Sequence, residues 1–473
     1  MNSTKNIISI VIATLLVICN VVPQVGFSIT VKEEEELSRQ VLQVISKQFE
    51  IIDDPAIIAY VNKIGKRILA TLPEQPFRYH FYVIREDVYN AFATPAGHIF
   101  VYTGLLEGMD EEEELAGILG HEIAHVYCRH ISKKIERSKK LTIATLAGVA
   151  AGVLIGAAGG GEAASAVTMG SMAAGQSAEL AYSREDEMQA DQFGLEFLTK
   201  AGYSASGLLK ILKKIRSKQW FGSEQIPTYL MTHPAVEDRI TYIGSWLENY
   251  DNTSKPIPLV SPVEFQRIHT RVETRYGDKQ IVLSRLQSEV TRNPQDPLAH
   301  YRYGLILARV GKRQDAIEQM RIALTKRAFD AYILKDLGHI YFLDGQYAQA
   351  LKTLGSACGM LPKDPECQFY LGRTQLEVGQ LDEATENFLN LVQQHPQFTP
   401  AYYYLGQSLG KQQNLGDAHY YLGVYHLRKR DLKAAQIQLQ LALKHNKDPE
   451  KRSQIEKWLG QLSGKSGKGN SQN

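Results

Sequence analysis

Residues 110–127 read DEEEELAGILGHEIAHVY, and this stretch decides what the first half of the chain is. At about 100° per residue, His121 and His125 lie on one face of a helix, one turn apart. Two imidazoles placed in this way can bind one zinc ion, and Glu122, next to that face, can polarise a zinc-bound water. The acidic residues that open the stretch suit the positive end of a helix dipole. The pattern therefore predicts a helix that carries a metal site.

A third metal ligand has to come from elsewhere in the chain. His130 lies nine residues after His121, about 180° round a continuous helix and away from the ligand face. Residues 182–191, YSREDEMQAD, place Glu187 and Asp191 one turn apart on a second predicted helix. We therefore expect Glu187 to complete a site of two histidines and one glutamate, while Asp191 holds a ligand imidazole or acts as a proton donor.

The composition is that of a globular protein with more than one domain. The chain has 473 residues, too many for one ordinary core, with 44% hydrophobic and 22% charged residues, which excludes wholesale disorder. Lys and Arg number 53 against 51 Asp and Glu, so the net charge is +2, which argues against a dedicated nucleic-acid binder. Four cysteines are too few for a disulfide scaffold. Cys358 and Cys367 flank a proline-containing turn, either as a disulfide or as two buried thiols.

The first 28 residues have the pattern of a secretory signal peptide. Lys5 supplies a basic start, residues 7–22 are almost wholly apolar, and the small residues Gly26 and Ser28 indicate cleavage near Ser28. The alternative is an uncleaved anchor helix, although about 16 apolar residues are few for a membrane span. The pattern predicts export to an oxidising compartment.

The mature chain is predicted to hold two folded parts. The first, residues 29–250, is expected to be α+β and mainly helical with a small sheet, with strands over 77–83 and 99–102 and helices over 110–137 and 179–200. Strand 99–103 is a candidate edge for an extended substrate. A proline-marked linker and connecting helix are expected over 251–290, and a disordered tail over 463–473.

The second part, residues 291–462, repeats every 34 residues. Four glycines hold this step: Gly304, Gly338, Gly372 and Gly406. Alanines that lie twelve residues after these glycines repeat with the same 34-residue step. This pattern is that of the tetratricopeptide repeat, in which two antiparallel helices cross at small residues. After Ala418 the step shortens to 17, so one helix is expected to serve two successive repeats. Such an all-α solenoid offers a concave groove that can hold peptides.

Residues 141–181, between the two predicted ligand helices, are rich in alanine and glycine. The first 21 of them are long and apolar enough for a membrane span. However, His125 and Glu187 must meet at one metal ion, so the chain has to return to the side it left, and the return stretch is polar. We predict a small-residue hairpin beside the active site, with a basic run before it and a peripheral membrane contact possible through residues 133–181.

Three blocks resemble those of the HtpX and CaaX-prenyl-endopeptidase superfamily. Residues 90–106, NAFATPAGHIFVYTGLL, resemble the strand block before its HExxH motif, and residues 182–191 resemble its third-ligand helix. The block 232–240 begins Thr-His-Pro and resembles a later histidine block of that superfamily. Together with a signal peptide and a C-terminal tetratricopeptide array, the chain looks like the BepA-like periplasmic branch.

This resemblance implies the roles of individual residues. It implies one zinc ion held by His121, His125 and Glu187, with Glu122 as the base and Asp191 as a supporting acid. It also implies an endopeptidase that hydrolyses misfolded or stalled envelope proteins, with repeats that recruit clients or the outer-membrane assembly machinery. The alternative is a periplasmic chaperone or assembly factor that acts mainly through the repeats.

Two positions leave open questions at the sequence level. His233 can stabilise the oxyanion or approach the zinc, and the simpler alternative is a loop histidine before a proline. Ala96 stands where the superfamily often has a second glycine.

Overall fold

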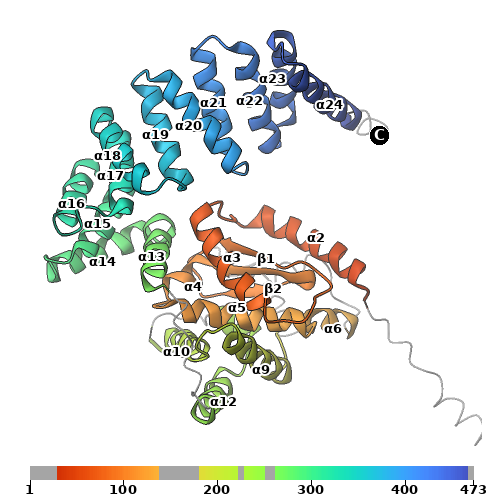
Figure 1. Cartoon of the computed structure of the whole chain (residues 1–473). Helices are drawn as coiled ribbons and strands as arrows, with labels where there is room; N and C mark the ends of the chain where they lie inside the picture. The colour runs from red at the N-terminus through yellow and green to blue at the C-terminus, as the bar shows by residue number, and fades with distance from the viewer. Residues whose placement is uncertain (1–28, 138–180, 222–227, 251–260, 467–473) are drawn as a thin grey trace, which may run out of the picture. The chain divides into compact units, whose positions relative to one another are not determined.

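The structure is a computed structural model, and it describes residues 29–137, 181–221, 228–250 and 261–466 (Figure 1). The predicted signal peptide, almost all of the predicted hairpin and the last seven residues of the predicted tail lie outside these ranges. The chain divides into two compact units, residues 1–277 and 278–473, which are described separately. Among the described residues, no helix is both long and apolar enough to cross a membrane.

The first unit is α+β and mainly helical, as predicted. Its strands are β1 (His80–Ile84), β2 (Ala91–Ala93) and β3 (His98–Tyr102). Its helices are α2 (Val31–Gln48), α3 (Pro55–Leu69), α4 (Thr103–Glu107), α5 (Glu112–Tyr127), α6 (His130–Arg137), α9 (Arg184–Lys200), α10 (Ser206–Phe221), α11 (Thr228–Thr232), α12 (Val236–Asn249) and α13 (Pro262–Tyr276). A short 3-10 turn, η1 (Pro95–Gly97), joins β2 to β3.

The three strands form one sheet in the order β1-β3-β2. β3 pairs in parallel with β1 and antiparallel with β2, so both of its edges are hydrogen-bonded. The expectation that strand 99–103 offers an edge to a substrate is therefore wrong, because that strand is central. β2 lies at the edge instead, and its three residues were too few to show an alternating pattern.

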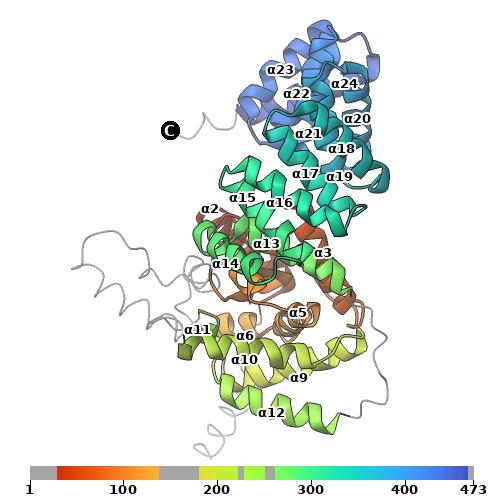
Figure 2. The same ribbon diagram turned by 90° about the vertical axis from the view of Figure 1, so that its left-hand side faces the viewer.

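The sheet is covered on both faces, because successive side chains of a strand point to opposite sides. Ile99 and Val101 belong to the core that α3 and α5 help to form, whereas Phe100 and Tyr102 lie in a second cluster with Val41 of α2. Beyond the first face, α5 lies between the sheet and the layer of α9 and α10, with α12 outermost in both views (Figures 1 and 2). The metal-site helix is thus enclosed on both sides.

The predicted helix over 110–137 is broken into two. α5 ends at Tyr127, and Arg129 has a φ of 55°, a left-handed conformation that turns the chain before α6 begins. The prediction that His130 lies on the far side of one continuous helix is therefore wrong, because His130 begins a second helix.

The second unit, over its described residues 278–466, consists of helices joined by short turns. They are α14 (Lys279–Arg292), α15 (Pro297–Arg309), α16 (Arg313–Lys326), α17 (Ala331–Leu343), α18 (Tyr347–Met360), α19 (Pro365–Glu377), α20 (Leu381–Gln394), α21 (Thr399–Lys411), α22 (Leu415–Arg428), α23 (Leu432–His445) and α24 (Pro449–Ser466). Helices pack in antiparallel pairs that cross at the predicted glycines: a Cβ on Gly338 would lie 2.6 Å from Leu354 Cγ. α22 packs on both α21 and α23, as the shortened step predicted.

Cys358 and Cys367 form a disulfide between α18 and α19, with their Cα atoms 5.6 Å apart. This decides between the two alternatives that the sequence left open. Cys128, in the first unit, is buried and free.

The division between the units lies inside the stretch predicted to connect them. α13 packs on α3 and α4, and its Phe265, Ile268 and Val272 belong to the core of the first unit. Arg271 Nε also lies 2.7 Å from Oδ2 of the buried Asp54, which caps the start of α3. At the other end of the chain, α24 continues to Ser466, four residues beyond the predicted end of the repeat domain.

We predict that residues 29–277 fold without the repeats, whereas residues 29–250 do not fold stably. Removing α13 deletes three core side chains, whose burial is worth about 1.5–3 kcal/mol each, exposes the apolar surface that they cover, and leaves Asp54 without Arg271. The shorter chain should melt at least about 10 °C lower in a circular dichroism scan, or aggregate. Equal melting temperatures for the two chains would contradict the assignment of α13 to the first unit.

We predict that Cys358→Ser lowers the stability of the repeat unit by about 2–3 kcal/mol under oxidising conditions, because closing a short loop restricts the unfolded chain. Urea unfolding of residues 278–473, with and without reductant, measures this. The reductant should abolish the difference between the variant and the unmodified chain, and a difference that persists would indicate a packing effect.

Candidate metal centre

The site forms where α5 and α9 cross at close range. Gly120 and Gly194 face each other at this crossing, and a Cβ on Gly194 would lie 3.3 Å from both the Gly120 carbonyl carbon and the His121 nitrogen. Two glycines thus let the helix backbones approach closely. The approach brings His121 of α5 to Glu187 of α9. Ser183 starts α9 with a capping box, which fixes the first turn that carries Glu187.

Four buried side chains offer ligand atoms to one point. The ligand atoms of His121, His125, Glu187 and His233 all lie within 4.8 Å of one another. His121 Nε2 is 3.0 Å from His125 Nε2 and 3.5 Å from Glu187 Oε2, and His125 Nε2 is 3.3 Å from Glu187 Oε1. Tetrahedral coordination at 2.0–2.1 Å bond lengths separates ligand atoms by about 3.3 Å, so three of these groups fit a zinc-sized ion.

Several polar atoms at this point have no hydrogen bond in the described part of the chain. They are both carboxylate oxygens of Glu122, Glu187 Oε1 and His233 Nε2, all fully buried. Buried polar groups are nearly always hydrogen-bonded, and orphans that converge on one point indicate a ligand that they bind. Imidazole nitrogens and carboxylate oxygens are ligands that suit a divalent transition metal.

Glu122 and His233 face each other beside the ligand atoms. His233 Nε2 lies 3.4 Å from Glu122 Oε1, because Thr232 Oγ1 engages His233 Nδ1 at 2.9 Å and the Tyr229 ring stacks on the imidazole. His233 follows α11, far from α5 in the sequence. The alternative of an ordinary loop histidine does not fit this placement, because the ring is fully buried within the cluster.

Asp191 and Arg239 support the opposite side of His121. Asp191 Oδ1 lies 2.8 Å from His121 Nδ1, so the carboxylate fixes the ring and leaves Nε2 toward the cluster. Arg239 of α12 donates from Nε and Nη2 to the two oxygens of Asp191, each at 2.7 Å, and its Nη1 lies 2.5 Å from Glu187 Oε2. Tyr242 donates a further hydrogen bond to Asp191. One fully buried guanidinium therefore balances two buried carboxylates.

His125 is held in a comparable way by neutral groups. Its Nδ1 lies 2.9 Å from His130 Nδ1, and His130 Nε2 lies 2.8 Å from Gln189 Oε1. The Tyr182 ring stacks on the His125 ring with their centroids 3.7 Å apart. His130 is outside the ligand cluster, and it reaches His125 only because the chain turns at Arg129.

Burial and the neighbouring charges shift the pKa values of these groups in different directions. Burial raises the pKa of Glu122 to about 7, which suits a group that takes up a proton near neutral pH. Burial alone would also raise the pKa of Glu187, but Arg239, His233 and His121 together outweigh it and lower that pKa. Arg239 and His121 likewise hold the pKa of Asp191 well below its usual range. Glu187 and Asp191 are therefore anionic at neutral pH, whereas Glu122 can exchange a proton.

Comparison with known proteins agrees with this geometry. Residues 55–247, which hold the whole cluster, match peptidase family M48. The chain carries an M48 metallopeptidase domain. Residues 304–365 and 341–409 match tetratricopeptide repeats, so the metallopeptidase is followed by the predicted solenoid.

The chain is similar to several curated proteins at moderate identity. The chain is 29% identical over 252 residues to a putative beta-barrel assembly-enhancing protease of Vibrio cholerae, covering 53% of this chain and 51% of the relative. It is 24% identical to a beta-barrel assembly-enhancing protease of Yersinia pestis, over 74% of this chain and 72% of the relative. It is also 30% identical over 197 residues to the mitochondrial metalloendopeptidase OMA1 of Arabidopsis thaliana, which is 41% of this chain and 37% of the relative. The chain thus spans about half the length of the Vibrio relative.

The structure brings together every residue that the sequence singled out for the site. His121, Glu122, His125, Glu187, Asp191 and His233 all lie in or against the cluster. Sequence reasoning missed the contact of Arg239 with Glu187 and Asp191, and the contact of His130 with His125. The signal for Arg239 was an arginine close to His233 in the same block, but a cation in the sequence does not show which carboxylates it will meet.

We predict that Arg239→Met lowers the free energy of unfolding of the metal-free chain by about 3–5 kcal/mol, because it leaves Glu187 and Asp191 buried without their cation. Denaturant unfolding of residues 29–277, followed by tryptophan fluorescence, measures the change. Arg239→Lys keeps the charge but loses the paired hydrogen bonds, so its loss should be smaller. Equal losses for the two variants would show that shape, and not charge balance, governs this position.

Proposed function

We propose that the chain is an exported zinc endopeptidase that cleaves unfolded or misassembled envelope proteins. The observation that carries this proposal is the convergence of fully buried ligand atoms from α5, α9 and the turn after α11, beside the two carboxylate oxygens of Glu122 that have no hydrogen bond among the described residues. The ligand set, two imidazoles and one carboxylate, is typical of catalytic zinc sites that keep a position open for water.

His121, His125 and Glu187 would hold the metal, with Asp191 and His130 orienting the two imidazoles. A bound zinc ion supplies a Lewis acid and lowers the pKa of a coordinated water toward about 7. Glu122 is placed to take the proton from the attacking water and to deliver it to the leaving amine. His233 Nε2 lies 3.4 Å from Glu122 Oε1 and close to the ligand atoms, where it can donate to the developing oxyanion.

The edge of the sheet suggests how a substrate binds. β2 packs on α5, and it is an edge strand three residues long. The residues of β2 are buried, so an extended peptide would add to this edge by main-chain hydrogen bonds only once the edge is uncovered, and it would then be bound with little regard to its sequence. This mode suits unfolded clients, and it replaces the predicted role of strand 99–103.

The envelope setting is supported by the signal-like N-terminus and by the similarity to proteins named beta-barrel assembly-enhancing proteases. The tetratricopeptide solenoid is the part we assign to recruiting clients or assembly machinery in the periplasm. The peptidase site and the repeats lie in separate units, so the two activities should be separable by mutation.

We predict that Glu122→Gln retains one zinc ion per chain and abolishes proteolysis of casein, because the side chain neighbours the ligands without being one. Glu187→Ala should lose both zinc and activity, since it removes a ligand. Zinc stoichiometry by plasma mass spectrometry, measured alongside cleavage, separates these two classes. Activity retained by Glu122→Gln would contradict the proposed base, whereas an unmodified chain that binds zinc without cleaving casein would favour the chaperone alternative.

A further inference from the structure

The first described residues of the chain are attached to the helix that follows the metal-site helix. The backbone nitrogen of Ile29 lies 2.7 Å from Glu136 Oε1 at the end of α6. The carbonyl oxygen of Ile29 accepts a hydrogen bond from Arg129 Nη2, also at 2.7 Å. Thr30 then starts α2 with a capping box. Both polar groups of one backbone residue are thus bound by side chains 100 or more positions away.

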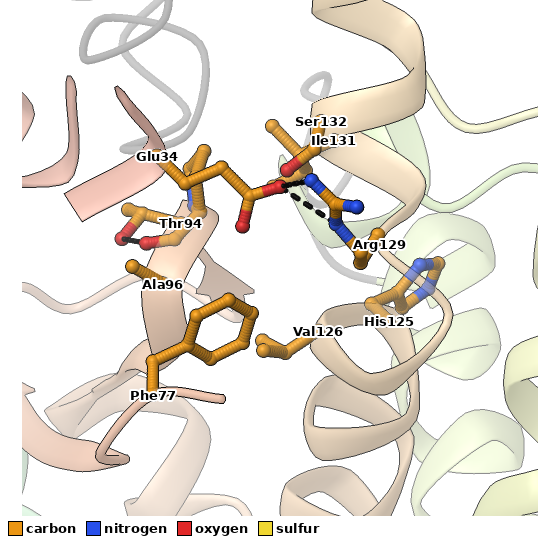
Figure 3. Close-up of a pocket in the computed structure, with 10 residues that line it drawn as sticks. Glu34, Phe77, Thr94, Ala96, His125, Val126, Arg129, Ile131 and Ser132 are labelled. Atoms are coloured by element: carbon orange, nitrogen blue, oxygen red, sulfur yellow. Dashed lines mark hydrogen bonds and ion pairs between the residues drawn. The ribbon is translucent and has the colours of Figure 1, made fainter. Parts of the chain in front are cut away.

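The same arginine joins α2 to the wall of a pocket beside the metal centre. Arg129 donates from Nε to Glu34 Oε1 at 2.7 Å, and Glu34 is buried in the first turn of α2. Glu34, Arg129 and His125 line one pocket, and Figure 3 shows the carboxylate and the guanidinium facing each other across its upper side. Because His125 belongs to the ligand cluster, the position of α2 shapes the surroundings of the site.

Ile29 is also the residue that the signal-peptide pattern exposes. Signal peptidases cut after small residues at the last and third-last positions of the leader, and Ser28 and Gly26 occupy these positions. Hydrolysis of the Ser28–Ile29 bond adds the oxygen of water to the Ser28 carbonyl carbon. The Ile29 nitrogen takes up protons and becomes an ammonium group at neutral pH, since an α-amino group has a pKa of about 8.

We propose that removal of the leader at Ser28–Ile29 creates an ion pair between the new Ile29 ammonium and Glu136, which fastens α2 and α6 together beside the metal centre. In the uncleaved chain the same nitrogen is a neutral amide with one N–H, so the contact is a single hydrogen bond. In the mature chain it carries a full charge and three N–H groups. Removal of the leader therefore strengthens the contact between Ile29 and Glu136, which holds the start of α2 against α6 beside the pocket. This inference rests on the proposed export of the chain.

A double-mutant cycle on the full mature chain tests the pair. One version begins at Ile29, and the other retains Ser28 as its first residue. Each is released from a cleavable fusion that leaves no extra residue. Each is made both with Glu136 and with the Glu136→Gln substitution, so that the cycle has four proteins. The Ile29 version should melt about 1–3 °C higher than the Ser28 version, and Glu136→Gln should remove this difference. The matched control is Glu35→Gln on the exposed side of α2, which should preserve it.

Mass spectrometry of the chain exported from cells gives the second readout, with Ile29 expected as the first residue. A different mature terminus would overturn the proposal, and so would a melting difference that persists in Glu136→Gln. Both readouts are independent of peptidase activity, so an inactive chain with an intact cycle would refute the proposed function alone. A normal peptidase without coupling between Ile29 and Glu136 would refute only this inference.

Discussion

The site depends on one buried charge. Arg239 is fully enclosed and lies against both Glu187 and Asp191, which are fully buried as well. Two carboxylates cannot remain ionised in such surroundings without compensation, because the loss of hydration is too costly. The guanidinium keeps both anionic, so that one can bind a metal and the other can fix His121. Every other feature of the centre requires these two carboxylates to stay charged.

The fold brings these groups together by close backbone approach and by enclosure. The facing glycines at positions 120 and 194 let α5 and α9 touch, and α12 then lies over α9 to deliver Arg239. Glu122 has no such cation of its own, and burial raises its pKa to about 7. The same interior therefore holds two kinds of carboxylate, one kept charged for binding and the other left able to exchange a proton.

Local patterns in the sequence predicted the parts of this arrangement that depend on local geometry. Helical periodicity placed His121 and His125 on one face, and the 34-residue step placed the crossings of the solenoid at glycines. Contacts between distant segments had no such signature. The turn at Arg129 rests on a left-handed residue that is not glycine, and it brought His130 to His125 against expectation. β2 is too short to show a strand pattern in the sequence, and without it the sequence wrongly predicts that β3 lies at the edge of the sheet. The roles proposed for the site residues stay predictions.

X-ray absorption at the zinc edge, on the purified mature chain loaded with one equivalent of zinc, tests the central claim most directly. The account predicts a first shell of two imidazole nitrogens and oxygen ligands at about 2.0–2.1 Å, with one oxygen from Glu187. Glu187→Gln should alter that shell while leaving two imidazoles bound. A spectrum with sulfur ligands, or one that Glu187→Gln leaves unchanged, would contradict the assignment of the metal to His121, His125 and Glu187.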